Sequence, residues 1–143
     1  MNVIAKKTEG IVLMYSFSLL VGLMLIGIGA AYAETAEILM ILLGIAVTII
    51  SGYHIVKYLQ QPHDIITVDN KGILHLPHDV TVNPADLTDV SYERASGKGF
   101  QYKWGEIVLF TSTDSYNFDY VDDCEETAKE LTRLMYESKN SKK

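Results

Sequence analysis

Residues 11–33, IVLMYSFSLLVGLMLIGIGAAYA, contain no Asp, Glu, Lys or Arg, and residues 38–59, ILMILLGIAVTIISGYHIVKYL, contain only Lys57. As helices rising about 1.5 Å per residue, these stretches reach about 33–34 Å, enough to cross a hydrocarbon core about 30 Å thick. A backbone in hydrocarbon must satisfy its own hydrogen bonds, so both stretches are expected to be helical. We predict two transmembrane helices, and the short connection over residues 34–37 makes them an antiparallel hairpin.

The basic residues at the ends of the hairpin predict its orientation. Lys6 and Lys7 precede the first span and Lys57 ends the second, whereas the connection carries Glu34 and Glu37. Basic flanks favour the cytoplasmic side, so we expect both termini in the cytoplasm and the connection outside.

A cleaved secretory signal is the alternative to this hairpin. Ala31-Tyr32-Ala33 before Glu34 has the form of a signal-peptidase site, with cleavage at Ala33–Glu34. The apolar run is about 20 residues, however, whereas a signal core is usually about 7–15 residues long. The length therefore favours the hairpin, and the mass of the mature chain distinguishes the two.

Small residues recur along one side of each predicted span, and such residues let helices approach closely in lipid. They predict packing within the hairpin, or alternatively self-association or contact with a partner's helix. The candidate packing residues are Ser18, Gly22, Gly29, Gly44, Thr48 and Gly52.

Charge divides the chain into two parts at Pro62. Of the 143 residues, 48% are hydrophobic and the net charge is −6. Residues 1–62 are neutral overall, and residues 63–143 carry nine basic and fifteen acidic side chains. We therefore predict a membrane hairpin over residues 1–62 and an acidic domain over residues 63–143. An acidic domain is a poor partner for nucleic acid, because phosphate binding needs clustered Lys and Arg.

The acidic part has the pattern of a mainly-β domain that ends in a helix. Short apolar or alternating runs separated by Gly, Pro, Asn and Asp predict strands, with a hairpin turn at residues 69–72 and a further turn at Gly105-Glu106. Capping-box patterns and apolar spacings of three and four residues predict an amphipathic helix over about residues 123–138. The expected fold is a bent sheet or partly open barrel, closed by the terminal helix. The expected strands cover residues 65–68, 73–76, 80–82, 90–94, 100–104, 107–111 and 116–120.

These residues resemble the bacterial pleckstrin-homology-like (PH-like) domains. The resemblance rests on residues 65–68, Gly72-Ile73, the element NPADLTDV at residues 83–90, the strand 107–111 and the final helix. The chain departs from the family at Ala85, where an aromatic residue is frequent. The resemblance implies a PH-like domain tethered to the cytoplasmic face of the inner (plasma) membrane, with membrane lipid around the two helices.

Chemistry-bearing motifs are sparse. His75, His78 and Asp79 form an H-x-x-H-D pattern, but Pro77 and the β pattern deny the helix that would make this a metal site. Cys124 falls on the apolar face of the terminal helix, which predicts a buried side chain. The sequence shows no recognisable catalytic set of a nucleophile, a base and an orienting residue. We therefore expect no enzymatic activity, no bound metal and no cofactor.

Two groups near one loop are candidate binding residues. Arg94, Lys98 and Lys103 could meet a lipid headgroup, although the domain's net negative charge opposes this. Phe100, Tyr102 and Trp104 alternate along one strand and could receive a protein partner or a second copy of the chain. We therefore expect a membrane-tethered interaction or scaffold module that is either oligomeric or a subunit of a larger membrane complex. The alternatives are an envelope-stress or antimicrobial-peptide immunity factor and a lipid-headgroup sensor.

Overall fold

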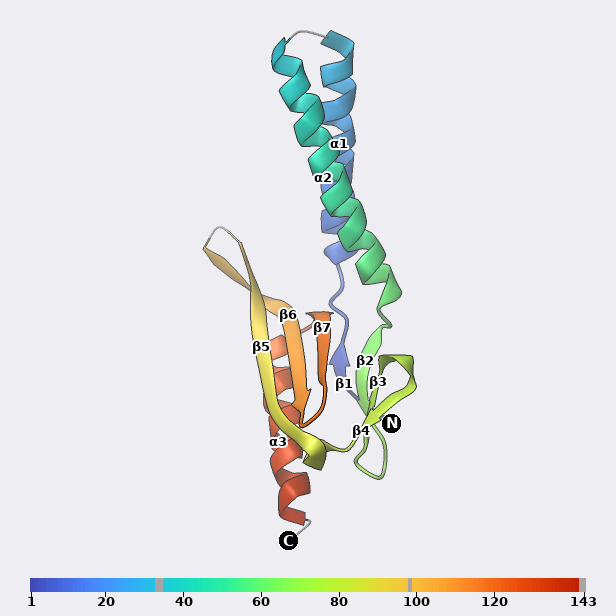
Figure 1. Ribbon diagram of the computed structural model, residues 1–143, viewed down its shortest axis with the longest axis vertical. Coiled ribbons are helices and arrows are strands. Elements are labelled where there is room, and N and C mark those ends of the chain that lie inside the picture. The colour runs from blue at the N-terminus through green and yellow to red at the C-terminus, as the bar shows by residue number, and fades with distance from the viewer. Residues whose placement is uncertain (33–34, 98, 142–143) are drawn as a thin grey trace. The chain divides into compact units, whose positions relative to one another are not determined.

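The computed structural model describes residues 1–32, 35–97 and 99–141, and these form two compact units (Figure 1). One unit is Glu9–Gln60, and the other combines Met1–Thr8 with Gln61–Lys143. The alternative cleavage site at Ala33–Glu34, Lys98 of the basic group and the last two lysines lie outside the described residues.

The helical unit consists of α1 (Ile11–Tyr32) and α2 (Thr35–Gln60), which pack against each other. Their bounds lie close to the predicted spans 11–33 and 38–59, because uninterrupted apolar sequence favours helix until Pro62 stops it. Ile11–Tyr32 and Ile38–Gln60 are long and apolar enough to cross a membrane. In each helix, only 11% of an 18-residue apolar segment is buried within the structure. The core helix of a soluble protein would be mostly buried.

The β-rich unit contains two antiparallel sheets. The first has the order β1-β2-β3-β4. Its strands are β1 (Asn2–Lys6), β2 (Asp64–Val68), β3 (Leu74–Leu76) and β4 (Val80–Val82). The predicted hairpin between β2 and β3 is confirmed, since Thr67 pairs with His75 across a turn in which Gly72 adopts φ +77°.

The second sheet has the order β5-β6-β7. It comprises β5 (Leu87–Gly97), β6 (Phe100–Thr111) and β7 (Ser115–Val121). The predicted turn at Gly105-Glu106 is wrong, because β6 runs through both residues as one strand. Gly105 instead permits a close backbone approach: a Cβ there would overlap the carbonyl oxygen of Glu93 on β5.

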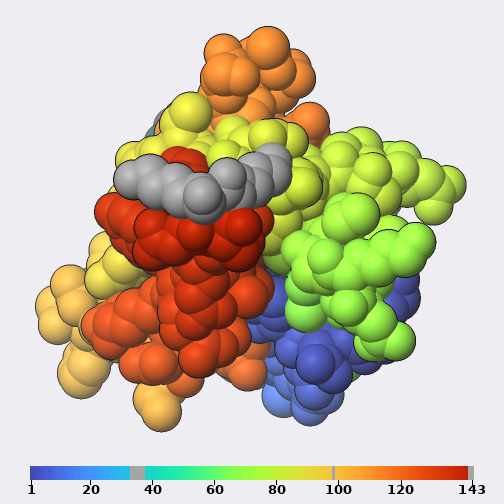
Figure 2. All heavy atoms as spheres, turned by 90° about the horizontal axis from the view of Figure 1, so that it is seen from below, coloured from blue at the N-terminus to red at the C-terminus, as the bar shows by residue number. Residues whose placement is uncertain are grey.

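Helix α3 (Cys124–Ser141) closes the unit and packs against β5, β6, β1 and the short 3₁₀ turn at Pro84–Asp86 (Figure 2). The predicted terminal helix is thereby confirmed, extending three residues beyond Ser138. One apolar core joins both sheets and this helix. Its largest fully buried side chains are Ile65, Ile66, Leu74, Leu87, Ile107, Leu109, Leu131, Val121 and Cys124.

The first eight residues differ most from the sequence-based division at Pro62. Met1–Thr8 belong to the β-rich unit, where Ala5 pairs with Ile66 and both side chains are fully buried. Lys6, a predicted flank of the first span, is the last residue of β1. The two apolar helices are therefore an insertion between the first and second strands of one domain.

Candidate interaction surface

The β5–β6 hairpin extends beyond the third strand of its sheet (Figure 1). Strand β7 pairs with β6 from Gly105 to Phe110, whereas β5 continues to pair with β6 as far as Gly97 and Phe100. Residues 95–97 and 100–104 therefore form a two-stranded ribbon, which we call the aromatic arm. An isolated two-stranded hairpin is at best marginally stable in water, so such a ribbon commonly gains stability from a further contact.

Three aromatic residues alternate along β6 in the arm, as the sequence predicted. Phe100 is 72% exposed, Tyr102 is 43% exposed and Trp104 is half-buried. The Tyr102 and Trp104 rings have centroids 5.8 Å apart, and Trp104 lies 6.1 Å from the ring of Tyr120 on β7. Tyr120 itself is buried at 5% exposure. The rings of Tyr102, Trp104 and Tyr120 thus form a row, and the exposure of the aromatic residues increases from Tyr120 to Phe100 near the tip of the arm.

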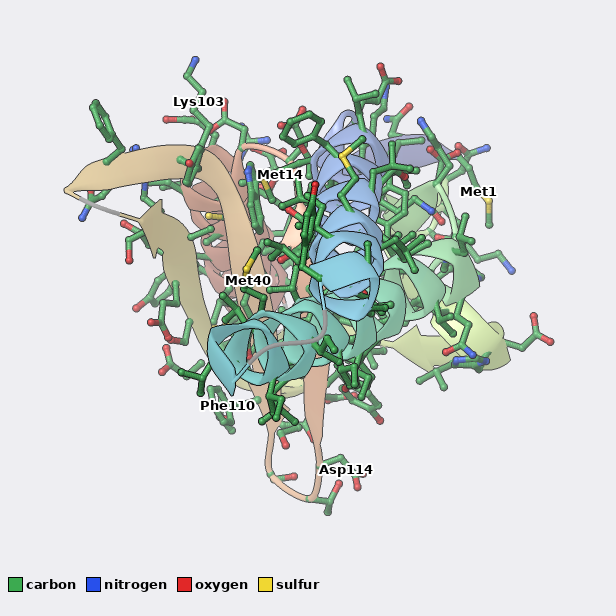
Figure 3. All side chains as sticks on the ribbon, turned by 90° about the horizontal axis from the view of Figure 1, so that it is seen from above. Met1, Met14, Met40, Lys103, Phe110 and Asp114 are labelled. Atoms are coloured by element: carbon green, nitrogen blue, oxygen red, sulfur yellow. The ribbon has the colours of Figure 1, made fainter. Side chains whose placement is uncertain are left out.

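The predicted basic group is brought together only in part. Arg94 donates from Nε to the Tyr102 carbonyl oxygen at 3.0 Å, and its Nη1 lies 3.4 Å from Oε2 of Glu125 in the first turn of α3. Lys103 is exposed and extends away from the arm (Figure 3). Arg94 therefore holds the arm to α3, which leaves Lys103 as the described member directed outward.

Glu125 belongs to a small ion-pair network on α3. Lys129 Nζ lies 3.0 Å from Glu125 Oε1 and 3.1 Å from Glu126 Oε1. The hydrogen bond and charge of Lys129, with the charge of Arg94, lower the pKa of Glu125. The carboxylates of Glu125 and Glu126 raise the pKa of Lys129 in turn. This network keeps Glu125 ionised beside Arg94.

The root of the arm adjoins the point where the chain leaves and re-enters the β-rich unit. The Thr8 N–H donates to the Tyr120 carbonyl oxygen at 2.8 Å, and the Lys7 N–H donates to the His63 carbonyl oxygen at 2.8 Å. Lys7 Nζ also donates to the Gln61 carbonyl oxygen at 2.7 Å, and burial lowers the pKa of this lysine. The sequence predicted a strand over residues 116–120 but did not identify Tyr120 as part of this junction.

The candidate packing residues of the helices occupy different positions. Gly22, Gly44 and Thr48 lie at a close approach of α1 and α2: a Cβ on Gly44 would lie 2.7 Å from the Gly22 carbonyl oxygen, and one on Gly22 would lie 2.6 Å from Thr48 Oγ1. Gly29 is buried, whereas a Cβ on Gly52 would meet nothing within 4 Å. Ser18 donates to the carbonyl oxygen of Met14, within its own helix.

His75, the first histidine of the H-x-x-H-D pattern, contacts Asp69 in the turn between β2 and β3. His75 Nε2 lies 3.2 Å from Asp69 Oδ2, and Asp69 Oδ1 accepts from the N–H groups of Lys71 and Ile73 at 2.8 and 3.0 Å. The Ile73 N–H, with smaller contributions from His75 and Lys71, lowers the pKa of Asp69. His78 occupies the left-handed region at φ 63°. Within the described ranges, no three His, Cys, Asp or Glu residues cluster as metal ligands.

Cys124 is fully buried at the start of α3, as predicted from its place on the apolar face. Burial raises the pKa of its thiol, outweighing the opposing charge of Arg94. A thiol that is both inaccessible and protonated is a poor nucleophile, so its environment is that of a core residue.

No protein-family model, curated protein or solved structure matches this chain.

Proposed function

We propose that this chain is a small integral membrane protein of bacterial PH-like type, in which α1 and α2 cross the inner membrane as a hairpin. Both termini lie in the cytoplasm, and the β-rich unit is a PH-like interaction module held beneath the membrane. The observation that carries this proposal is the exposure of two long apolar helices, since burying such surface in lipid removes it from water.

Three features of the β-rich unit support the module. Two antiparallel sheets share one core with a C-terminal helix, and the PH-like resemblance likewise implies a mainly-β unit closed by a terminal helix. The unit is built from chain on both sides of the helical insertion, so two covalent connections hold it to the hairpin. Strand β5 is an edge strand whose Tyr92 is 42% exposed, and an edge strand can accept a strand from a partner or a second copy.

Alkaline carbonate extraction of membranes containing the full chain tests the hairpin. Retention of the chain in the membrane pellet is expected, and release into the supernatant would contradict it. The mass of the purified chain addresses the cleaved alternative, because a chain beginning at Glu34 would lack the first helix and β1.

Thiol labelling tests the orientation with a built-in negative control, because Cys124 is buried. An impermeant maleimide applied to intact bacterial cells should label a Glu34→Cys variant. An Asn140→Cys variant on α3 should be labelled only after the cells are broken. Labelling of the Asn140→Cys variant alone in intact cells would instead place the β-rich unit outside.

Cross-linking in native membranes followed by size analysis in detergent tests the interaction role. A species larger than one chain is expected, and a Tyr92→Glu change at the exposed β5 edge should reduce it. A matched Tyr136→Glu change on α3 should not. A monomer before and after cross-linking would count against a scaffold role.

A further inference from the structure

The aromatic arm starts at the end of the β-rich unit from which both connections to the helices emerge. Lys6 pairs with Asp64, and Lys7 is hydrogen-bonded to His63 and Gln61, so the two connections leave side by side. Thr8 is hydrogen-bonded to Tyr120, whose ring is followed by those of Trp104 and Tyr102. Within this unit, Figure 1 places the arm at the same end as the close of β1 and the start of β2.

Chain length keeps this end close to a bilayer that contains the helices. Only Glu9 and Gly10 separate Thr8 from α1, and an extended chain spans at most about 3.6 Å per residue, so Thr8 lies within about 11 Å of the start of α1. The five β6 residues of the arm extend it by roughly 17 Å at about 3.3 Å per residue. The headgroup region therefore lies within reach of the arm.

The side chains of the arm suit that region. Trp and Tyr concentrate where hydrocarbon meets water, because an apolar ring with a polar tip is satisfied there. Phe100, the most exposed of the arm's aromatic residues, stands at the tip, and outward-directed Lys103 offers a cation that anionic headgroups attract. Among the described residues, β7 pairs with β6 only from Gly105 to Phe110, so the β6 edge of the arm has no neighbouring strand.

We infer that the aromatic arm is a second membrane anchor, with Phe100 and Tyr102 inserted in the headgroup region of the leaflet that the hairpin enters. This inference rests on the proposed membrane hairpin. A bilayer is favoured over a protein as the occupant because both short connections to the apolar helices leave the β-rich unit at the end where the arm begins. The arm would then help to orient the β-rich unit on the membrane.

Tryptophan fluorescence can test this inference, because Trp104 is the only tryptophan. The full chain carrying Trp104→Phe and Phe100→Trp is placed in nanodiscs of phosphatidylcholine and phosphatidylglycerol, with or without lipid brominated near the headgroup. Insertion predicts at least about a twofold loss of emission with brominated lipid, together with a blue-shifted maximum. The matched control combines Trp104→Phe with Tyr136→Trp on α3, where Tyr136 is 59% exposed and no quenching is expected.

The outcomes separate the anchor from the hairpin on which it rests. Emission from the Phe100→Trp variant that is unaffected by bromine overturns the anchor, and carbonate resistance of the same variant shows that the hairpin stands. Equal quenching of the Phe100→Trp and Tyr136→Trp variants also overturns it, because the whole unit would then lie on the lipid without a specific arm. Quenching confined to the Phe100→Trp variant supports it. Release of the chain by carbonate would overturn the proposed function itself.

Discussion

Ala5 of β1 pairs with Ile66 of β2, although both apolar helices lie between them in the sequence. Both side chains are fully buried in the core of the β-rich unit. Folding of this unit therefore requires chain from before and after the helical insertion. This dependence links the insertion of the hairpin to the stability of the domain.

An Ala5→Asp change should destabilise the β-rich unit by about 3 kcal/mol or more, because it buries a charge without a partner. Urea unfolding of the full chain in detergent, followed by Trp104 fluorescence, measures the effect. Val3→Asp is the matched control, since Val3 lies on the same strand at 38% exposure. Equal effects of the two changes would mean that β1 is not part of the core.

A Gly105→Ala change should cost about 1–3 kcal/mol or more, since its Cβ would overlap the Glu93 carbonyl oxygen and force the β5–β6 pair apart. Gly97→Ala on the same hairpin is the control, because a Cβ there would meet only Tyr102 at an ordinary 3.9 Å. The same urea midpoints report both variants. A Gly105→Ala variant as stable as the control would refute the close approach.

A Gly44→Ala change should weaken packing of α1 on α2 by about 1–3 kcal/mol, because the added Cβ would lie 2.7 Å from the Gly22 carbonyl oxygen and 2.8 Å from Ile26 Cγ1. Steric trapping of the hairpin in bicelles measures this free energy. Gly27→Ala, where a Cβ would meet nothing within 4 Å, should have little effect. The prediction fails if the two variants unfold alike.

The Asp69 carboxylate should make the β-rich unit more stable at neutral than at acid pH. Its pKa is lowered below 3.8 in the folded chain, chiefly by the Ile73 N–H. Its contribution is therefore present above the unfolded pKa and lost as the pH falls through the folded pKa. Urea midpoints between pH 6 and pH 3 should fall less steeply in an Asp69→Asn variant. His75→Gln should retain most of the wild-type slope, because the backbone donors remain.

Cys124 should resist maleimide at neutral pH in the folded chain, since its thiol is buried and its pKa is raised. An Asn140→Cys variant should react at its exposed position on α3 under the same conditions. Adding urea should bring the two rates together as the core opens. Rapid labelling of Cys124 before unfolding would show that the start of α3 is open.

The aromatic arm shows which structural features sequence patterns predict and which they miss. Alternation placed Phe100, Tyr102 and Trp104 on one strand face, and that remains true in the structure. The pattern also suggested a turn at Gly105, because a glycine between two apolar runs is typical of turns. Only pairing with β5 and β7 shows that this glycine continues one strand, and only that pairing shows where the third strand stops.

The ion pair of Arg94 with Glu125 is another feature beyond sequence reasoning. Sequence proximity grouped Arg94 with Lys98 and Lys103, whereas its partner lies on a helix that follows two further strands. Side-chain pairing depends on which elements pack together, and local periodicity contains no information about that. Arg94 is therefore engaged with Glu125, whereas Lys103 is the described cation of the group that points outward.

The sequence by itself determined the two apolar helices, most strands of the mainly-β part and the buried face of α3. These follow from local properties: uninterrupted apolar length, residue alternation and turn chemistry. Tertiary structure alone decided that residues 1–8 complete the β-rich unit and that the arm begins where the chain enters and leaves it. The physical reason is that β1 is recruited by hydrogen bonds and burial against a strand beyond the helical insertion, and such long-range pairing is specified by the whole core.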